Sequence, residues 1–243
     1  MQDLLQKFED RLQEIEAYLQ LLDVIEKQVQ DGIPRIGETI SISVDQQKIL
    51  YSSVFLQLYN LIEATVTNCI DGIANAIMSN GYKPDDLSED IRREWVRFMA
   101  RTHTDLNFEN RLKETSSLCE HLIQSLPVSK FKIEKGQGGN WDDLAIQDIC
   151  KRLGLSLSIE SSIASSIKRP FKNDQGTLIY IKTLRNDLAH GSLSFVECGA
   201  NVTVSDLQSL KDRTVSYLRA VVKLFQNFID TYEYLSPQQR LKK

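Results

Sequence analysis

The apolar residues of the chain recur at intervals of three and four along most of its length, the spacing that gathers them on one face of an α-helix. The first stripe predicts a helix from about residue 2 to residue 30, which the Asp-Gly-Ile-Pro sequence at 31–34 ends. Its members are Leu5, Phe8, Leu12, Ile15, Leu19, Leu22, Ile25 and Val29. Residues 1–31 carry eight acidic and three basic side chains, so the outer face of this amphipathic helix is acidic and solvated. Three heptads favour a helix packed on its own domain; the alternative is a coiled-coil arm that binds a partner.

A second long stripe predicts a helix from about residue 45 to residue 79. Its expected buried positions are Ile49, Val54, Leu58, Ile62, Val66, Ile70, Ile73 and Ile77. Three polar residues, Asn60, Glu63 and Asn68, lie among these apolar positions. Residues 35–44, between the two helices, are short and partly alternating, which indicates a linker or an edge strand and marks the candidate domain boundary.

Shorter patterns of the same kind fill most of the remaining chain. They predict helices over about 84–101, 110–126, 141–153, 174–190 and 205–234. Ser88 is a plausible N-cap for the first of these, and a capping box at Ser205 and Gln208 opens the last. Residues 127–140 have no helical pattern, and we expect them to be irregular or to form a short strand.

Two β-rich runs follow the helix predicted over 174–190. Residues 194–196 and 202–204 flank a segment that contains Gly199, and this arrangement predicts a small β-hairpin. The tail from residue 236 to residue 243 is polar, and we expect it to fray.

The composition agrees with a helical fold. Eleven glycines and five prolines in 243 residues are too few for the many turns of a sandwich or barrel. Hydrophobic residues make up 42% of the chain and charged residues 26%, which suits a globular protein with a real core. We therefore predict an all-α protein with an N-terminal amphipathic helix at 1–31, a helical domain at 45–235 and a polar tail at 236–243.

Charge and cysteine content limit the possible functions. A net charge of −4 excludes a uniformly basic protein that coats nucleic acid, so any contact with nucleic acid must come from a local basic patch. The four cysteines, Cys69, Cys119, Cys150 and Cys198, include no C-x-x-C pair, which leaves a zinc site without support. The charged N-terminus has no signal-peptide pattern, and no apolar run approaches membrane-spanning length, so we expect a cytoplasmic protein without a membrane association. We also expect that it uses no metal or cofactor.

The most concentrated chemical signal is the segment from Arg185 to His190. A histidine can take or give a proton near neutral pH, and an arginine guanidinium can bind a phosphate oxygen in a bidentate way. These two groups suffice for metal-free RNA cleavage, because the ribose 2′-hydroxyl serves as the nucleophile. On an ideal helix a spacing of five places the two side chains about 140° apart, so the spacing permits a shared site without requiring one. The alternative is structural: Arg185 pairs with Asp187 or another acid, and His190 caps the helix.

Basic residues gather before this segment. Between residues 168 and 185 the chain has five basic side chains and one acidic residue, Asp174. The five are Lys168, Arg169, Lys172, Lys182 and Arg185. This cluster is either a positive patch that attracts the phosphates of RNA or an ordinary solvated surface.

The segment Leu184–Gly191, LRNDLAHG, resembles the R-x4–6-H signature of HEPN domains. In this match Arg185 is the arginine, Asn186 the polar residue that often follows it, and His190 the histidine. NLIEATVTNCI (residues 60–70), NWDDLAIQDICKRLGL (140–155) and SFVECGANVTVSDL (194–207) are similar to the flanking regions of the MAE-like HEPN subgroup of bacterial conflict systems. The resemblance extends over about residues 45–235.

The resemblance implies a bundle of long antiparallel helices that dimerises and places two such motifs face to face. It also implies a metal-independent endoribonuclease that acts as a toxin or as an antiviral, abortive-infection effector. Arg185 would bind phosphate, His190 would act as acid and base, and Asn186 would position the substrate or the motif. Glu63 would orient the arginine or the histidine, and an antitoxin or a defence-complex protein is the expected partner besides RNA.

One position departs from a related subgroup, in which nucleotidyltransferase antitoxins modify a tyrosine two residues after the histidine. Here that position is Ser192, which argues against control by adenylylation. Two other functions stay open: a non-catalytic helical interaction subunit of a defence or regulatory complex, and an RNA-binding module without turnover.

Overall fold

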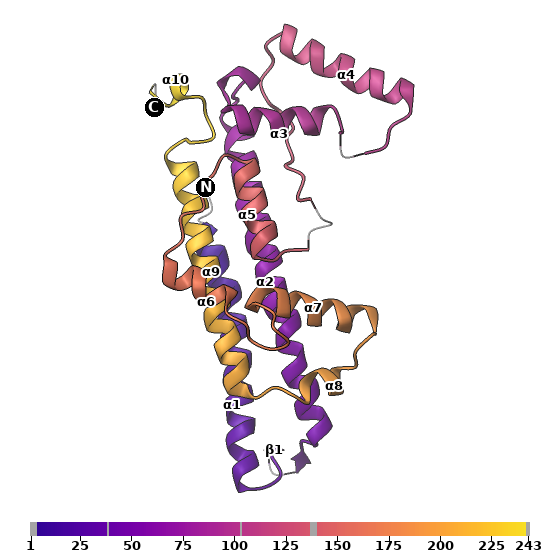
Figure 1. The fold of residues 1–243 in the computed structure, drawn as a ribbon, viewed down its shortest axis with the longest axis vertical. Coiled ribbons are helices and arrows are strands. Elements are labelled where there is room, and N and C mark those ends of the chain that lie inside the picture. The colour runs from indigo at the N-terminus through magenta and orange to yellow at the C-terminus, as the bar shows by residue number, and fades with distance from the viewer. Residues whose placement is uncertain (1–3, 38, 103, 137–139, 242–243) are drawn as a thin grey trace. The chain divides into compact units, whose positions relative to one another are not determined.

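The computed structural model describes residues 4–37, 39–102, 104–136 and 140–241 (Figure 1). Its elements are α1 (Leu4–Asp31), β1 (Arg35–Ile36), β2 (Ile40–Ser41), α2 (Val44–Ser79), the 3-10 helix η1 (Pro84–Asp86), α3 (Glu89–Met99), α4 (Phe108–Ile123), α5 (Asp143–Arg152), α6 (Ser161–Lys168), α7 (Thr177–His190), α8 (Phe195–Gly199), α9 (Val204–Asp230) and α10 (Pro237–Arg240). The predicted all-α class is confirmed. The chain divides into two compact units: unit 1 is residues 1–65, 140–143 and 159–220, and unit 2 is residues 66–139, 144–158 and 221–243.

Helix α1 packs within unit 1. It buries seven apolar residues: Leu4, Phe8, Leu12, Ile15, Leu19, Leu22 and Ile25. Two positions differ from the predicted stripe. The first buried residue is Leu4 rather than Leu5, and Val29 is 44% exposed. The Glu9 carboxylate accepts two hydrogen bonds from the Arg219 guanidinium of α9, at 2.8 and 3.0 Å. This helix is therefore packed on its own domain, as its short stripe favours.

The long helices of unit 1 are antiparallel. Arg11 of α1 donates a hydrogen bond to Asn60 of α2, and Tyr18 donates one to the Leu50 carbonyl. A later residue of α1 thus contacts an earlier residue of α2, as in antiparallel helices. The turn between them contains the two-stranded hairpin β1–β2, in which residue 36 pairs with residue 40. The edge strand expected in residues 35–44 is thus present as one of two very short strands.

Helix α2 buries most of its predicted stripe. Val54, Leu58, Ile62, Val66, Ile70, Ile73 and Ile77 are fully covered, whereas Ile49 is 41% exposed. Contrary to our expectation, α2 is long and apolar enough to cross a membrane by length and composition. Since 56% of its most apolar window is buried inside the fold, this property also suits a core helix, and it is weak evidence for a membrane span.

The predicted hairpin after the 174–190 helix is wrong: residues 195–199 form the short helix α8. Ser194 and Glu197 make a capping box, in which the Ser194 Oγ accepts the Glu197 N–H and the Glu197 carboxylate accepts the Ser194 N–H. This local start overrides the β propensity of the neighbouring residues. Gly199 has a packing role, because a Cβ there would overlap the Lys48 carbonyl oxygen.

The start of α9 and the segment at 161–168 also differ from the prediction. Helix α9 is capped by Thr203 and Asp206, which exchange hydrogen bonds of 3.1 Å, rather than by Ser205. The serine-rich segment at 161–168 forms a helix, α6, that its weak periodicity did not reveal.

Unit 2 is organised around buried residues of α3. Trp95 and Glu94 are almost fully covered, and Ser88 caps the helix as predicted. The described part of 127–140 is irregular, as expected. The tail does not fray over residues 236–240, since the Ser236 N–H donates to the Asp86 carbonyl at 2.8 Å and Pro237–Arg240 forms α10. Residues 242–243 lie outside the described part of the chain.

Candidate functional site

Helix α7 carries the Arg185–His190 segment. Its buried face consists of Thr177, Leu178, Tyr180, Ile181 and Leu188. The ring of Tyr180 packs edge-on against Phe55 of α2, with 5.8 Å between the ring centroids. Gly191 ends the helix in the left-handed conformation, at a φ of +73°, which a glycine adopts without steric cost. The helix and its glycine stop are therefore as predicted.

The guanidinium of Arg185 lies over a tyrosine ring of α2. Its Cζ is 3.7 Å from the centroid of Tyr59, within the range of a cation–π contact. Tyr59 is buried, and its hydroxyl accepts a hydrogen bond of 2.9 Å from the Trp141 backbone N–H. The ring beneath the guanidinium is thus fixed by the main chain of another segment of unit 1.

The edge of the same guanidinium faces Glu63, one helical turn after Tyr59. The Arg185 Nη2 lies 4.0 Å from the Glu63 Oε2, at the outer limit of an ion pair, and 49% of the glutamate side chain is exposed. The Arg185 Nε is buried and has no hydrogen-bond partner among the described residues. Arg185 is therefore oriented by stacking, and its guanidinium donates no hydrogen bond to the described residues.

His190 is the last residue of α7 and is exposed to solvent. No hydrogen bond holds its ring within the described part of the chain. Asn186, beside Arg185, is half-buried. Because residues five apart leave an ideal helix about 140° apart, Arg185 and His190 of one copy point in different directions.

The structural alternative predicted that Arg185 pairs with Asp187 or with another acid, and the structure shows the second of these. Asp187 does not take Arg185 as its partner; its Oδ1 accepts a hydrogen bond of 3.2 Å from the Ser192 hydroxyl. The acid that faces Arg185 is Glu63 instead. Ser192, which occupies the position of the modified tyrosine in the related subgroup, is thus engaged with the end of α7.

The basic cluster divides into two kinds of residue. Lys182 forms an ion pair with Asp142, and Lys172 forms one with Asp206 at 3.2 Å. Lys168 and Arg169 are exposed. The sequence revealed only Asp174 as a neighbouring acid, because Asp142 and Asp206 lie 40 and 34 residues from their lysines.

The buried thiols are not poised for reaction. Burial raises the pKa of Cys150 to about 12 and that of Cys198 to about 11, with Asp187 adding to the effect at Cys198. Burial also raises the pKa of Cys69. The thiolate is the reactive form of cysteine, so these three thiols are inert near neutral pH. Among the described residues, no group of three His, Cys, Asp or Glu side chains could hold a metal ion.

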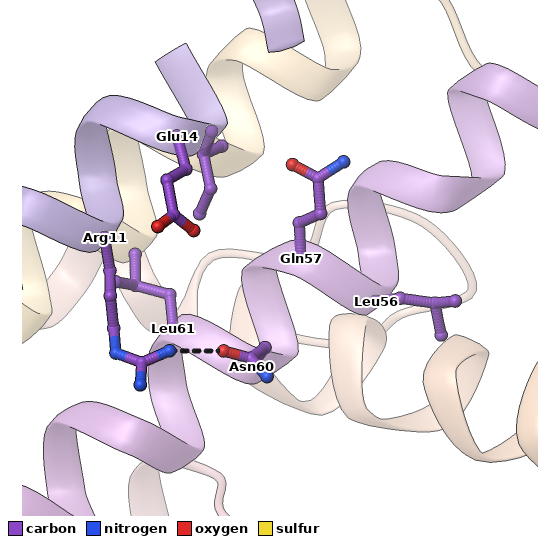
Figure 2. A pocket seen from close by; sticks show the side chains of 7 residues that line it. Arg11, Glu14, Leu56, Gln57, Asn60 and Leu61 are labelled. Carbon is purple, nitrogen blue, oxygen red and sulfur yellow. Dashed lines mark hydrogen bonds between the residues drawn. The ribbon is translucent and has the colours of Figure 1, made fainter. Parts of the chain in front are cut away.

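Unit 1 also has a polar groove between α1 and α2, with a volume of about 420 Å³ (Figure 2). It is lined by Arg11, Glu14, Ile15, Leu56, Gln57, Asn60 and Leu61. The Arg11 Nη1 donates a hydrogen bond of 2.9 Å to the Asn60 Oδ1 across the groove.

Sequence reasoning selected Glu63 but missed Tyr59 and the groove. The available signal was the position of Tyr59 and Asn60 one turn before Glu63 on the same helix face, in a helix that is otherwise apolar there. The contact of Tyr59 with Arg185 joins distant parts of the chain and leaves no local pattern.

In a comparison with protein-family models, residues 1–234 fit the model described as HEPN_MAE_28990/-like HEPN. The match includes the first helix, beyond the span of about 45–235 that the sequence resemblance suggested. No curated protein matches the chain. No solved structure matches it either.

Proposed function

Because the chain belongs to the HEPN_MAE_28990/-like HEPN family, we propose that it is a metal-independent endoribonuclease. The observation that carries the proposal is the setting of Arg185. Its guanidinium is stacked on a fixed tyrosine ring, its side chain is 24% exposed, and its contact with Glu63 is long, at 4.0 Å. A guanidinium of this kind is oriented in advance and still able to bind an oxyanion.

In the proposed reaction the ribose 2′-oxygen attacks the adjacent phosphorus. His190 takes the 2′-hydroxyl proton as a base or protonates the departing 5′-oxygen as an acid. Arg185 stabilises the negative charge that develops on the phosphoryl oxygens. The O2′–P bond forms as the P–O5′ bond breaks, which leaves a 2′,3′-cyclic phosphate and a 5′-hydroxyl.

The active form in this proposal is a homodimer. The angle of about 140° between Arg185 and His190 on one helix is poorly suited to a single phosphate. A second copy related by a two-fold axis would bring its His190 toward the Arg185 of the first. Asn186 then orients the motif or the substrate, while the exposed Lys168 and Arg169 contact flanking phosphates more readily than the ion-paired Lys172 and Lys182.

The biological role that we propose is that of a toxin or an antiviral, abortive-infection effector, restrained by a partner protein. Induced expression of the wild-type chain should then arrest growth of a bacterial host, and expression of His190→Ala should not. Equal amounts of both proteins must be present for the comparison to count.

The direct test incubates purified protein with RNA in the presence of a chelator. We expect products that end in a 2′,3′-cyclic phosphate, and a loss of cleavage of about 10²- to 10⁴-fold in His190→Ala. Arg93→Ala, which removes an exposed arginine of α3, is the control and should cleave like the wild type. Cleavage by His190→Ala at the wild-type rate would refute the role of His190, and the absence of cleavage by the wild type would favour the non-catalytic interaction subunit.

A further inference from the structure

The groove between α1 and α2 has the chemistry of a binding site for a neutral, polar molecule. Its two charged groups, Arg11 and Glu14, have opposite signs, so the groove does not favour an ion of either sign. Two amide side chains, Gln57 and Asn60, add both donors and acceptors of hydrogen bonds. Figure 2 shows Glu14 and Gln57 pointing from the two helices into the space between them.

The base of the groove is apolar. Ile15 of α1 and Leu61 of α2 are 3% and 1% exposed, and they belong to the packed interface of the two helices. A volume of about 420 Å³ lies within the range of roughly 300–1,000 Å³ that is usual for small-ligand sites. An apolar floor with polar groups at the rim suits a flat molecule whose face is apolar and whose edge makes hydrogen bonds.

The groove also lies close to the proposed catalytic arginine. Asn60 directly follows Tyr59, on which Arg185 stacks, and it precedes Glu63 by three residues. Residues three apart on a helix are neighbours, with about 5–6 Å between their Cβ atoms. A molecule bound at Asn60 is therefore about one helical turn from Glu63, whose carboxylate lies 4.0 Å from the Arg185 guanidinium.

We propose that this groove binds an unstacked nucleobase of single-stranded RNA, next to the phosphate held at Arg185. The inference rests on the proposed function, because it takes Arg185 as the phosphate contact. Proteins read single-stranded RNA by hydrogen bonds to the edges of splayed-out bases, and asparagine and glutamine amides can bond to such an edge in a bidentate way. The Asn60 Oδ1 accepts from Arg11, which orients the Asn60 amide, and Gln57 supplies the second amide.

The groove thus makes the enzyme selective for the base beside the cut. Substitution of both amides by leucine, Gln57→Leu with Asn60→Leu, should flatten the base preference at that position. Asn68→Leu, a change of the same kind on α2 outside the groove, is the matched control and should leave the preference unchanged. Sequencing of the product ends measures the preference.

A second measurement does not depend on these variants. The full chain with His190→Ala is crosslinked by light to an unstructured RNA oligonucleotide that carries one 4-thiouridine or one 6-thioguanosine, and the labelled peptides are identified by mass spectrometry. We expect labels in residues 11–15 or 56–61. Labels confined to other segments, or no label, would overturn the groove as a base site.

The two readouts separate this inference from the proposed function. Cleavage by the wild type with an unchanged base preference in the double variant and with labels outside the groove refutes the groove alone. Labels in the groove without cleavage by the wild type support base binding and refute the nuclease.

Discussion

Two arginine–glutamate contacts in this chain have the same chemistry and opposite character. In unit 2, Glu94 is 1% exposed and accepts two hydrogen bonds from Arg152, at 3.2 and 2.6 Å, besides an ion pair with Arg97. In unit 1, Glu63 is 49% exposed and approaches Arg185 only to 4.0 Å. The first contact is saturated and structural, whereas the second leaves its arginine able to bind something else.

The difference follows from what surrounds each arginine. Arg152 also donates to the Glu134 carbonyl at 3.1 Å, so both carboxylate and carbonyl acceptors converge on it. Arg185 has an aromatic ring beneath it, which attracts the cation and accepts none of its in-plane hydrogen bonds. A tyrosine platform therefore fixes the position of a guanidinium without consuming its donors.

The largest expected effect is on unit 2. Arg152→Ala removes two hydrogen bonds from the buried carboxylate of Glu94 and should lower the free energy of unfolding by about 3–5 kcal/mol, the usual cost of removing the partner of a buried charge. Urea unfolding measures the loss. The buried thiol of Cys150, on α5 two residues before Arg152, should also react faster with a thiol reagent, while that of Cys198 in unit 1 should not. Unfolding within 1 kcal/mol of the wild type would show that the Glu94 cluster is not structural.

The next effect concerns activity rather than stability. Arg185→Lys keeps the positive charge and loses the planar fork and the stacking on Tyr59, so kcat/KM for RNA should fall about a hundredfold, or about 2.7 kcal/mol. The stability should change by less than about 1 kcal/mol, because the Arg185 side chain makes no hydrogen bond within the described part of the chain and its ion pair with Glu63 is long. A lysine variant as active as the wild type would mean that Arg185 acts only as a point charge or not at all.

The smallest effect is that of Glu63→Ala. An exposed ion pair at 4.0 Å contributes little to folding, and we expect a change within about 0.5 kcal/mol in the free energy of unfolding. In the same variant kcat/KM should change by less than about fivefold, because Tyr59 still holds the guanidinium. A larger loss of activity with unchanged stability would assign Glu63 a direct part in catalysis and weaken the importance of the tyrosine platform.

Periodicity in the sequence was sufficient for the long helices and for the glycine that ends α7, because both depend on residues close together in the chain. It failed after His190, where a two-residue reciprocal cap at Ser194 and Glu197 determines a helix despite β-prone neighbours. It also could not foresee that Lys182 and Lys172 are neutralised, since their acids come from distant segments. The catalytic roles of Arg185, Asn186 and His190 remain predictions of the motif, whereas the platform under Arg185 is visible only in the fold.

The position of Trp141 has a practical consequence. The chain has two tryptophans, both buried, and each belongs to a different unit: Trp95 to unit 2 and Trp141 to unit 1. Since the main chain of Trp141 holds the tyrosine on which Arg185 stacks, the indole emission of a chain that keeps only Trp141 is an intrinsic optical signal for that neighbourhood. A chain that keeps only Trp95 gives the corresponding reference signal from the other half of the molecule.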